Sequence, residues 1–388
     1  MGDDRPTPRK HLPELDGLRG FAVLGVMIFH FLQGLPTGGS PAGLVVKGSR
    51  LGQTGVDLFF VLSGFLITGI LLDTRRGPHY FRNFYARRTL RIFPLHYLAV
   101  ALFYFVIGPL AGLGISPMRD QLWAWLYLVN IPMTFAPETY RLPGHFWSLA
   151  VEEHFYLAWP LVVWGASRRG LVAICVTLIP LAIGCRILLY SYGFTDFFFT
   201  LCRTDSLAIG ALVAILFRWR VPGLRDMMIA LAVAAAICIP LWVATGGEGI
   251  PAVTMTRSTL IAVAYAILLA ATVVMPADWW WKRLLSSSIP RFFGRYSYGL
   301  YVFHALISFP WKWEDFRAAV PGEIPAMAAM CSVNGAISLA AAMLSWNLLE
   351  KHCLRLKRYF EYPGRDACPR PGPTATARAS DAARARAP

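Results

Sequence analysis

Long apolar runs, separated by short groups of charged residues, Pro and Gly, repeat along the 388-residue chain. A helix needs ~20 apolar residues to cross the ~30 Å hydrocarbon core of a bilayer, and several runs approach that length. The stretch 121–135, with Trp123, Trp125 and Tyr127, is too short and is expected at the membrane interface. We therefore predict an all-α polytopic membrane protein of about ten transmembrane helices. They lie near residues 18–34, 52–72, 92–114, 147–166, 170–190, 198–217, 227–245, 257–275, 296–313 and 325–349.

The positions of Lys and Arg predict how these helices are oriented. Counting the loops on alternate sides places about 28 basic residues on the side of the N-terminus and about 7 on the other. Cytoplasmic loops are enriched in these residues, so both termini are expected in the cytoplasm. We divide the chain into a tail over 1–11, a membrane domain over 12–358 and a disordered tail over 359–388, which is rich in Pro, Ala and Arg.

Composition and charge exclude several classes of protein. With 56% hydrophobic and 15% charged residues, the chain does not read as a soluble globule. The net charge of +15 is spread over short loops without a basic stripe that carries aromatics, so no nucleic-acid partner is expected. The seven cysteines form no C-x-x-C pair, and neither a disulfide nor a metal site is expected.

Two polar residues share one face of the first predicted helix. Arg19 and His30 are eleven residues apart, which corresponds to about 20° from whole turns and a rise of about 16 Å. A cation at the membrane surface and an imidazole deeper in the membrane could hold a long anionic substrate whose reactive end lies at the histidine. An interfacial anchor and a hydrogen-bonded packing histidine explain the pair equally well.

Arg88 and Arg91 lie in the loop that precedes the third predicted helix. Their spacing puts both on one helical face, and arginine forms bidentate hydrogen bonds to phosphate. The alternative is that they only anchor the cytoplasmic side of the helix.

The fourth predicted helix places Ser148 and Glu152 four residues apart, with His145 one turn earlier. An intramembrane carboxylate suits acid–base or orienting work. Arg203 and Asp205 are a candidate substrate-binding pair, or they form a structural ion pair. Glu153 and His154 point elsewhere and are expected to be structural.

The ninth predicted helix aligns Ser297, Tyr301 and His304 on one face. For His304 we expect the role of a hydrogen-bonded packing residue. The chain has no P-loop lysine motif, no G-x-S-x-G, no H-E-x-x-H and no G-x-G-x-x-G after a strand. ATP-driven pumping, hydrolase chemistry and dinucleotide redox chemistry are therefore disfavoured.

Several of these motifs together carry a resemblance to a known family. They are Leu15-Asp16-Gly17-Leu18-Arg19-Gly20 with His30, the stretch 55–65, Arg88-x-x-Arg91, Trp147-Ser148-Leu149 with Glu152 and Glu153, Arg203-x-Asp205, and Ser297 to Tyr301 with His304. In this order, over residues 12–358, the chain resembles the acyltransferase-3 family of bacterial integral-membrane O-acyltransferases. It departs from the family pattern at Ala150, at His154 and at Glu350-Lys351-His352, which would suit a specialised acceptor.

The resemblance implies transfer of an acyl group, usually acetyl, from acyl-CoA to a hydroxyl, in the bacterial cytoplasmic membrane. Acyl-CoA is then a substrate, and no permanently bound cofactor is expected. The short single-domain form is similar to the macrolide 3-O-acyltransferases, so we expect a macrolide or another glycosylated secondary metabolite as acceptor. A cell-surface polysaccharide or lipid-linked glycan is the alternative acceptor. A small-molecule transporter is the alternative of another class, and the absence of matching halves argues against it.

Each candidate residue receives a role under this reading. His30 is the predicted general base, because an imidazole with an ordinary pKa near 6.5 can remove a hydroxyl proton during attack. Asp57 is the candidate that orients its ring, with Glu152 as an alternative orienting or acceptor-binding group. The other candidates are Arg19, Arg88 and Arg91 for the CoA phosphates, and Trp147, Ser148, Arg203 and Asp205 for substrate binding.

Overall fold

The computed structural model describes residues 12–112, 116–138, 143–219, 223–245, 251–307 and 313–362. The described elements are all helical, with no strand among them, which confirms the all-α prediction. The predicted tail 1–11, and the predicted disordered tail from residue 363 onward, lie outside the described residues. The first residues assigned to that second tail are ordered, since a 3-10 helix ends at Phe360 and Tyr362 is buried.

The first half of the described chain holds four long helices and several short ones. They are α1 (Pro13–Leu32), α2 (Pro41–Ser49), η1 (Arg50–Thr54), α3 (Gly55–Thr74), α4 (Tyr80–Leu102), η2 (Phe103–Ile107), α5 (Gly108–Leu110), α6 (Met118–Trp125), α7 (Asn130–Phe135), η3 (Gly144–Phe146) and α8 (Trp147–Gly165). The predicted interfacial stretch 121–135 is divided between α6 and α7.

The second half continues the same pattern. Its elements are α9 (Arg168–Ser191), η4 (Thr200–Arg203), α10 (Thr204–Leu216), α11 (Leu224–Thr245), α12 (Pro251–Val274), α13 (Trp280–Ser286), α14 (Ser288–Ile307), α15 (Trp313–Ala319), α16 (Glu323–Ser345), η5 (Trp346–Glu350), α17 (Lys351–Arg355) and η6 (Leu356–Phe360).

All ten predicted spans overlap one of these helices. Six stretches of the described chain are long and apolar enough to cross a membrane, which fits a polytopic membrane protein, and the count of ten stays a prediction. The six are Pro13–Leu32, Pro41–Thr74, Tyr80–Leu110, Arg168–Ser191, Met255–Val274 and Glu323–Phe360.

Two predicted boundaries were wrong by two turns or more. The third span begins at Tyr80 instead of residue 92, and the ninth begins at Ser288 instead of 296. The first turns of both helices carry arginines, so hydropathy does not reveal them. Arg88 and Arg91 consequently lie on helix α4 and not in a loop, and their shared helical face is real.

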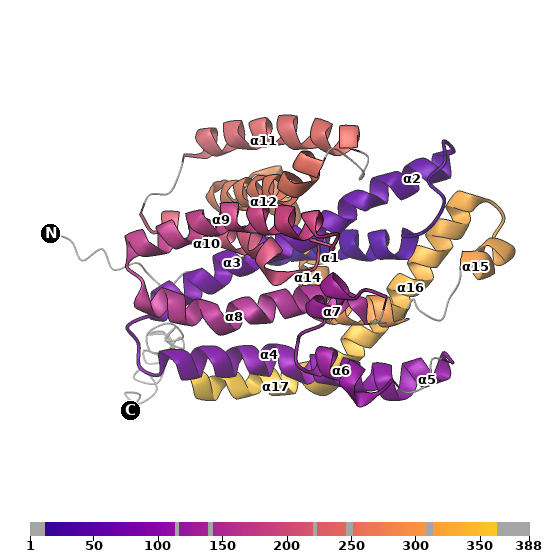
Figure 1. The fold of residues 1–388 in the computed structure, drawn as a ribbon, viewed down its shortest axis with the longest axis horizontal. Coiled ribbons are helices and arrows are strands. Elements are labelled where there is room, and N and C mark those ends of the chain that lie inside the picture. Colours follow the sequence, from indigo (N-terminus) through magenta and orange to yellow (C-terminus); the bar gives the residue numbers. More distant parts are fainter. Residues whose placement is uncertain are drawn as a thin grey trace, which may run out of the picture.

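The long helices lie side by side along the long axis of the molecule, and α16 crosses them obliquely (Figure 1). Within this bundle α1 packs along α14, and α3 packs along α10. Glycines allow the second pair to approach closely, because a Cβ at Gly210 would lie only 2.1 Å from the carbonyl oxygen of Val61. A Cβ at Gly64 would meet the carbonyl oxygen of Leu207 at 2.0 Å. Small residues at such crossings are characteristic of helix packing in membranes.

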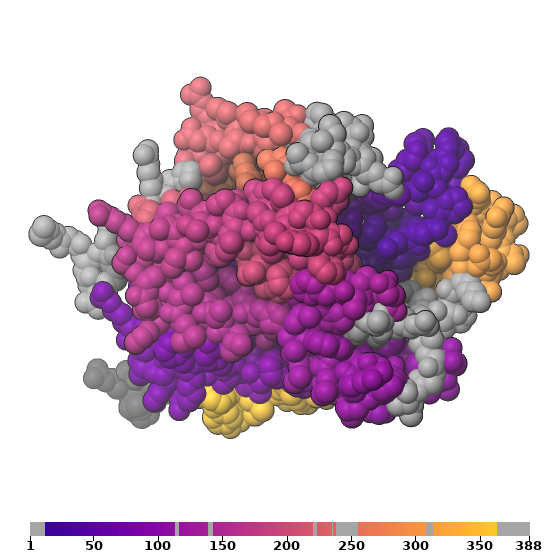
Figure 2. Space-filling view, in the orientation of Figure 1, coloured from indigo at the N-terminus to yellow at the C-terminus, as the bar shows by residue number. Residues whose placement is uncertain are grey.

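The outer surface of the bundle is apolar. Leu157, Leu161 and Trp164 form an exposed stripe on α8, and they are 67%, 58% and 56% exposed. Residues of α8 and α9 form much of the face seen in Figure 2. On a soluble protein so large an apolar surface would be a liability, whereas it is the surface that a lipid-embedded helix needs.

Candidate functional site

A basic cavity of about 350 Å³ opens at one end of the bundle. Both ends of the described chain reach it, since Leu12 and Tyr362 contribute to its wall. Five arginines and one lysine line it against two acidic residues. These charged residues are Arg19, Arg87, Arg88, Arg91, Arg218, Lys357, Asp16 and Asp73. The excess of positive charge makes this cavity suited to a polyanion.

Arg88 and Arg91 have unused hydrogen-bond donors in this cavity. The Arg88 guanidinium carbon lies 5.9 Å from the ring centre of Phe84 and 5.4 Å from that of Tyr156, which holds the planar group between two rings. Neither Arg88 nor Arg91 donates a hydrogen bond to any described residue. By contrast, Arg218 is engaged with Asp73 at 2.6 Å. Arg88 and Arg91, like Lys357 in the same cavity, are therefore available to a bound anion.

A second, inner cavity of about 110 Å³ adjoins the basic cavity and shares Arg19, Arg88 and Arg91 with it. It brings these arginines together with Ser148 and Glu152, two further residues predicted for the site. The remaining lining residues come mainly from α3, α4, α8 and α14, and they include Ser63, Tyr156, Ser297 and Tyr301. Two predicted groups, the phosphate-binding arginines and part of the substrate-binding set, thus face one continuous region.

Glu152 is held by two hydroxyl groups. The Ser63 hydroxyl donates to it at 2.7 Å and the Tyr156 hydroxyl at 3.1 Å. These two donors pair both carboxyl oxygens of Glu152 inside the bundle. Glu152 is placed to accept a hydrogen bond from a ligand, and it makes no contact with His30.

Tyr301 closes the inner end of this cavity. Its hydroxyl donates to the backbone carbonyl of His145 at 2.6 Å, so the Ser148 hydroxyl, also 2.6 Å away, must donate to the Tyr301 oxygen. The ring centre of Tyr301 lies 5.5 Å from that of His304. The Tyr301 side chain therefore separates the inner cavity from the histidines.

His30 lies beyond Tyr301, half-buried near the end of α1. Its Nδ1 atom is 3.0 Å from the carbonyl oxygen of Val26 and 3.1 Å from Nε2 of His304. His304 is fully buried, as expected of a packing residue, but its contact with His30 was not foreseen. A third ring, His145, lies with its centre 5.4 Å from that of His304.

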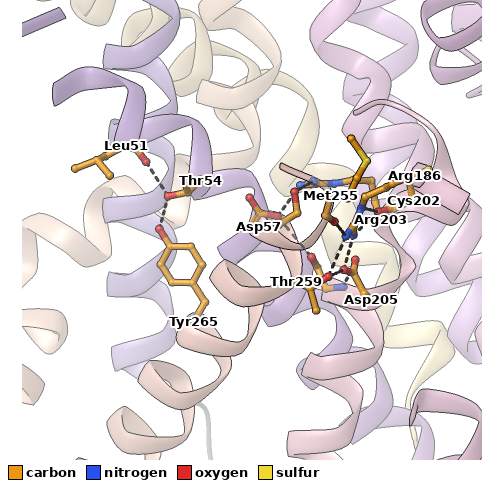
Figure 3. Close-up of polar contacts among 12 residues, drawn as sticks. Leu51, Thr54, Asp57, Arg186, Cys202, Arg203, Asp205, Met255, Thr259 and Tyr265 are labelled. Atoms are coloured by element: carbon orange, nitrogen blue, oxygen red, sulfur yellow. Dashed lines mark hydrogen bonds and ion pairs between the residues drawn. The ribbon is translucent and has the colours of Figure 1, made fainter. Parts of the chain in front are cut away.

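Asp57 does not orient His30, contrary to the sequence-based prediction. It accepts a hydrogen bond from Arg203 at 2.5 Å and one from the Ser206 hydroxyl at 3.5 Å (Figure 3). Spacing within a single helix cannot tell which residue of a distant helix a carboxylate will meet.

Arg203 and Asp205 belong to the same buried cluster rather than to a cavity. They are 2% and 0% exposed. Asp205 pairs with Arg186, which also donates to Thr259 and to the backbone carbonyls of Cys202 and Met255 (Figure 3). This placement favours the structural alternative over substrate binding for both residues.

Trp147 also packs into this cluster. The guanidinium carbon of Arg203 lies 5.7 Å from the centre of the Trp147 ring, and Phe60 and Phe197 flank it at 5.6 and 5.1 Å. Of the four predicted substrate-binding residues, Ser148 is the one that lines the inner cavity.

A third, opposite cavity of about 840 Å³ lies at the far end of α1 from the basic cavity. Phe29, Leu32 and Gln33 line it, which places it next to His30 along the helix. Its other walls come from residues 34–37, α2, η1 and α12, and Lys47 of α2 is one of the lining residues. His30 therefore lies between the inner cavity and the opposite cavity.

Several residues of these sites were not predicted from the sequence. Arg218 and Lys357 in the basic cavity were counted only as orientation signals, because loop charge and ligand-binding charge look alike in a sequence. Ser63 and Tyr156 gave no signal of their own. The i,i+4 spacing of Glu152 and Tyr156 is the one local pattern that could have pointed to their contact.

Known proteins share sequence similarity with this chain. A sequence profile of an acyltransferase domain matches residues 12–343. The peptidoglycan O-acetyltransferase OatA of Listeria monocytogenes is 30% identical over 325 residues, which cover 76% of this chain and 49% of that protein. A Bacillus subtilis protein named "Putative peptidoglycan O-acetyltransferase YrhL" is 31% identical over 320 residues, covering 76% of this chain and 48% of its own length.

A Staphylococcus aureus protein named "Putative O-acetyltransferase" is 27% identical over 383 residues, covering 88% of this chain and 57% of its own. The chain thus spans about half the length of the curated relatives it matches. No solved structure matches it.

Proposed function

The chain belongs to the acyltransferase-3 family of acyltransferase domains, and from this membership we propose that it transfers an acetyl group from acyl-CoA to a hydroxyl of a cell-surface glycan. The observation that carries the proposal is the pair of adjoining cavities. They lead from a cluster of cations, through Glu152 and Ser148, to the neighbourhood of His30. The protein would act in the bacterial cytoplasmic membrane.

The basic cavity would hold the phosphates of CoA. Arg88 and Arg91 present guanidinium donors that no described residue uses, and such planar groups bind phosphate oxygens in pairs. Arg19 lies on α1 at the junction of the two cavities, about 16 Å along the helix axis from His30. An acyl-pantetheine arm that starts at the arginines would run inward along this face of α1.

His30 would act as the general base. As the acceptor hydroxyl attacks the thioester carbonyl, its proton passes to the imidazole of His30 and a new C–O bond forms. The C–S bond then breaks, and the departing thiolate takes the proton back from His30, leaving an ester and free CoA. Proton transfer of this kind typically contributes about 10²–10⁴-fold in rate.

The named relatives favour a glycan over a secondary metabolite as acceptor, because two of them carry peptidoglycan in their names. The opposite cavity, on the other side of His30 from the basic cavity, offers an approach for such an acceptor, with Lys47, Arg50 and Gln53 among its lining residues. Donor and acceptor would then meet at His30 from opposite ends of α1.

The test is release of free CoA by the full chain, purified in detergent and reconstituted in liposomes. Acetyl-CoA would be supplied with chitin oligosaccharides, muramyl dipeptide or a macrolide, each in a separate reaction. We expect CoA release and an acetyl ester with a glycan acceptor.

Ester formation on the macrolide alone would show that the acceptor is a secondary metabolite and would overturn the glycan as acceptor. A protein that leaves acetyl-CoA intact with every acceptor, yet moves one of these compounds across the liposome membrane, would be a transporter and would overturn the proposal.

A further inference from the structure

His304 has no role in the reaction as described above, yet its ring packs directly on the predicted base. The side chain is 0% exposed on α14, and its ring centre lies 5.0 Å from that of His30 on α1. Among the described residues neither ring contacts a carboxylate. Two neutral imidazoles in contact restrict where each can carry its proton, because one ring nitrogen donates and the other accepts.

The backbone of α14 decides the protonation of His304. Its Nδ1 atom lies 2.7 Å from the carbonyl oxygen of Tyr301 and 3.2 Å from that of Leu300. Carbonyl oxygens only accept hydrogen bonds, so Nδ1 must carry the hydrogen. In the neutral ring Nε2 then holds a lone pair, and this atom faces His30.

The protonation of His304 in turn determines which nitrogen of His30 carries the hydrogen. The Nδ1 atom of His30 lies 3.1 Å from this lone pair and 3.0 Å from the carbonyl oxygen of Val26. Both neighbours are acceptors, so Nδ1 of His30 carries the hydrogen and shares it between them. Its Nε2 atom keeps a lone pair, and no described residue binds this atom.

The reverse arrangement leaves contacts unpaired. If His304 donated from Nε2, it would be an imidazolium, a charge buried without a carboxylate. The lone pair of His30 Nδ1 would also face the carbonyl oxygen of Val26. When His30 and His304 each carry the hydrogen on their own Nδ1 atom, every contact joins a donor to an acceptor and no charge is buried.

We propose that His304 is a positioning residue that fixes His30 in the Nδ1–H tautomer, so that Nε2 of His30 is the nitrogen that receives the acceptor proton. This inference rests on the proposed function for its catalytic part. When Nε2 takes the proton, the charge on His30 is stabilised by its Nδ1–H bond to His304, because hydrogen bonds from ionised donors are stronger. His304 thereby does for His30 what the carboxylate does in a Ser-His-Asp triad, without a charge of its own.

Three variants test the positioning role. His304→Leu removes the acceptor, and we expect kcat to fall about 10- to 100-fold, part of the about 10²–10⁴-fold that a general base supplies, with an unchanged KM for acetyl-CoA. In His304→Gln the amide oxygen can reach the place of Nε2 and accept the same hydrogen bond. We expect the kcat of this variant to be at least about tenfold higher than that of His304→Leu. His96→Leu removes another fully buried imidazole, which binds the Ala124 carbonyl, and is the matched control with near-normal kcat.

Nitrogen NMR of histidine-labelled protein tests the tautomer without any turnover. The resonances lost in His30→Gln identify the His30 ring, and we expect them to show a protonated Nδ1 and an unprotonated Nε2 in the wild type. His304→Leu should weaken this preference, whereas His96→Leu should not.

Other results would contradict the inference. A protonated Nε2 on His30, or equal activity of His304→Leu and His304→Gln, would overturn it even if the protein transfers acetyl groups. Conversely, the expected tautomer in a protein that releases no CoA would overturn the proposed function and leave the hydrogen-bond assignment in place.

Discussion

Arg203 donates a hydrogen bond of 2.5 Å to Asp57, and this contact ties the start of α10 to the first turn of α3. Both side chains are buried, and Arg203 is also packed between aromatic rings. The pair thus fixes α10 relative to α3, the helix that carries Ser63 of the inner cavity.

Removal of one partner should destabilise the protein rather than slow its chemistry. Asp57→Ala leaves the Arg203 charge buried and unpaired, which costs about 3–5 kcal/mol in comparable buried pairs. We expect a lower Tm in detergent, and a partial recovery of Tm in the double variant Asp57→Leu with Arg203→Met. A normal Tm combined with a loss of kcat would instead return Asp57 to a catalytic role.

Loss of the imidazole at position 30 should nearly abolish acetyl transfer. His30→Ala is expected to lower kcat by about 10²–10⁴-fold, because no base remains to take the acceptor proton. Expression, membrane insertion and binding of acetyl-CoA should persist. His352→Ala, which changes an exposed histidine on α17, is the control. More than about a tenth of wild-type kcat in His30→Ala would exclude His30 as the base.

Arg88→Ala and Arg91→Ala should each raise the KM for acetyl-CoA. A hydrogen bond to a charged group contributes about 1.5–3 kcal/mol, which corresponds to about 10- to 150-fold in affinity. Arg82→Ala changes an exposed arginine of the same helix that lies outside the basic cavity, and its KM should stay near the wild-type value. Equal KM values for all three variants would reduce the α4 arginines to membrane anchors.

The close crossing of α3 and α10 should not tolerate a methyl group. Gly210→Ala places a Cβ 2.1 Å from a backbone oxygen, and overpacking of this kind costs about 1–3 kcal/mol. Gly184→Ala is the matched control, because nothing lies within 4 Å of a Cβ there and alanine favours the helix. We expect a lower Tm in detergent for the first and an unchanged or higher Tm for the second. Equal Tm values would mean that the helices cross less closely.

Reporter fusions can test the predicted orientation. The first turn of α9 is basic, with Arg168 and Arg169, whereas the segment after the helix contains Gly193 and no basic residue before Arg203. A fusion after Arg169 should report the cytoplasm and one after Gly193 the opposite side. The same side for both fusions would contradict the alternation from which ten spans and cytoplasmic termini were predicted.

Local patterns in the sequence predicted those parts of the fold and site that depend on one helix at a time. Apolar runs located every long helix, and the spacings of Arg88 with Arg91 and of Ser148 with Glu152 placed each pair beside one cavity. The starts of α4 and α14 were missed because their first turns carry arginines, which a hydropathy pattern reads as loop. There the charges face a cavity or the membrane surface instead of lipid.

Contacts between distant helices could not be predicted in this way. His30 meets His304 across 274 residues, and Asp57 meets Arg203 across 146. Each of these side chains was given a role in the sequence-based prediction, yet nothing in a single sequence tells which of several buried polar groups will be its partner. Asp57 was therefore assigned to the wrong neighbour, and His304 to packing alone.

The buried cluster of Asp57, Arg186, Arg203 and Asp205 has a consequence in any membrane that carries a voltage. A transmembrane voltage does about 2.3 kcal/mol of work per elementary charge for each 100 mV that the charge crosses. Two acids matched by two arginines present no net charge to that field. A voltage therefore exerts no net force on this junction of α3, α9 and α10, and the packing that supports the site should stay the same with and without a voltage.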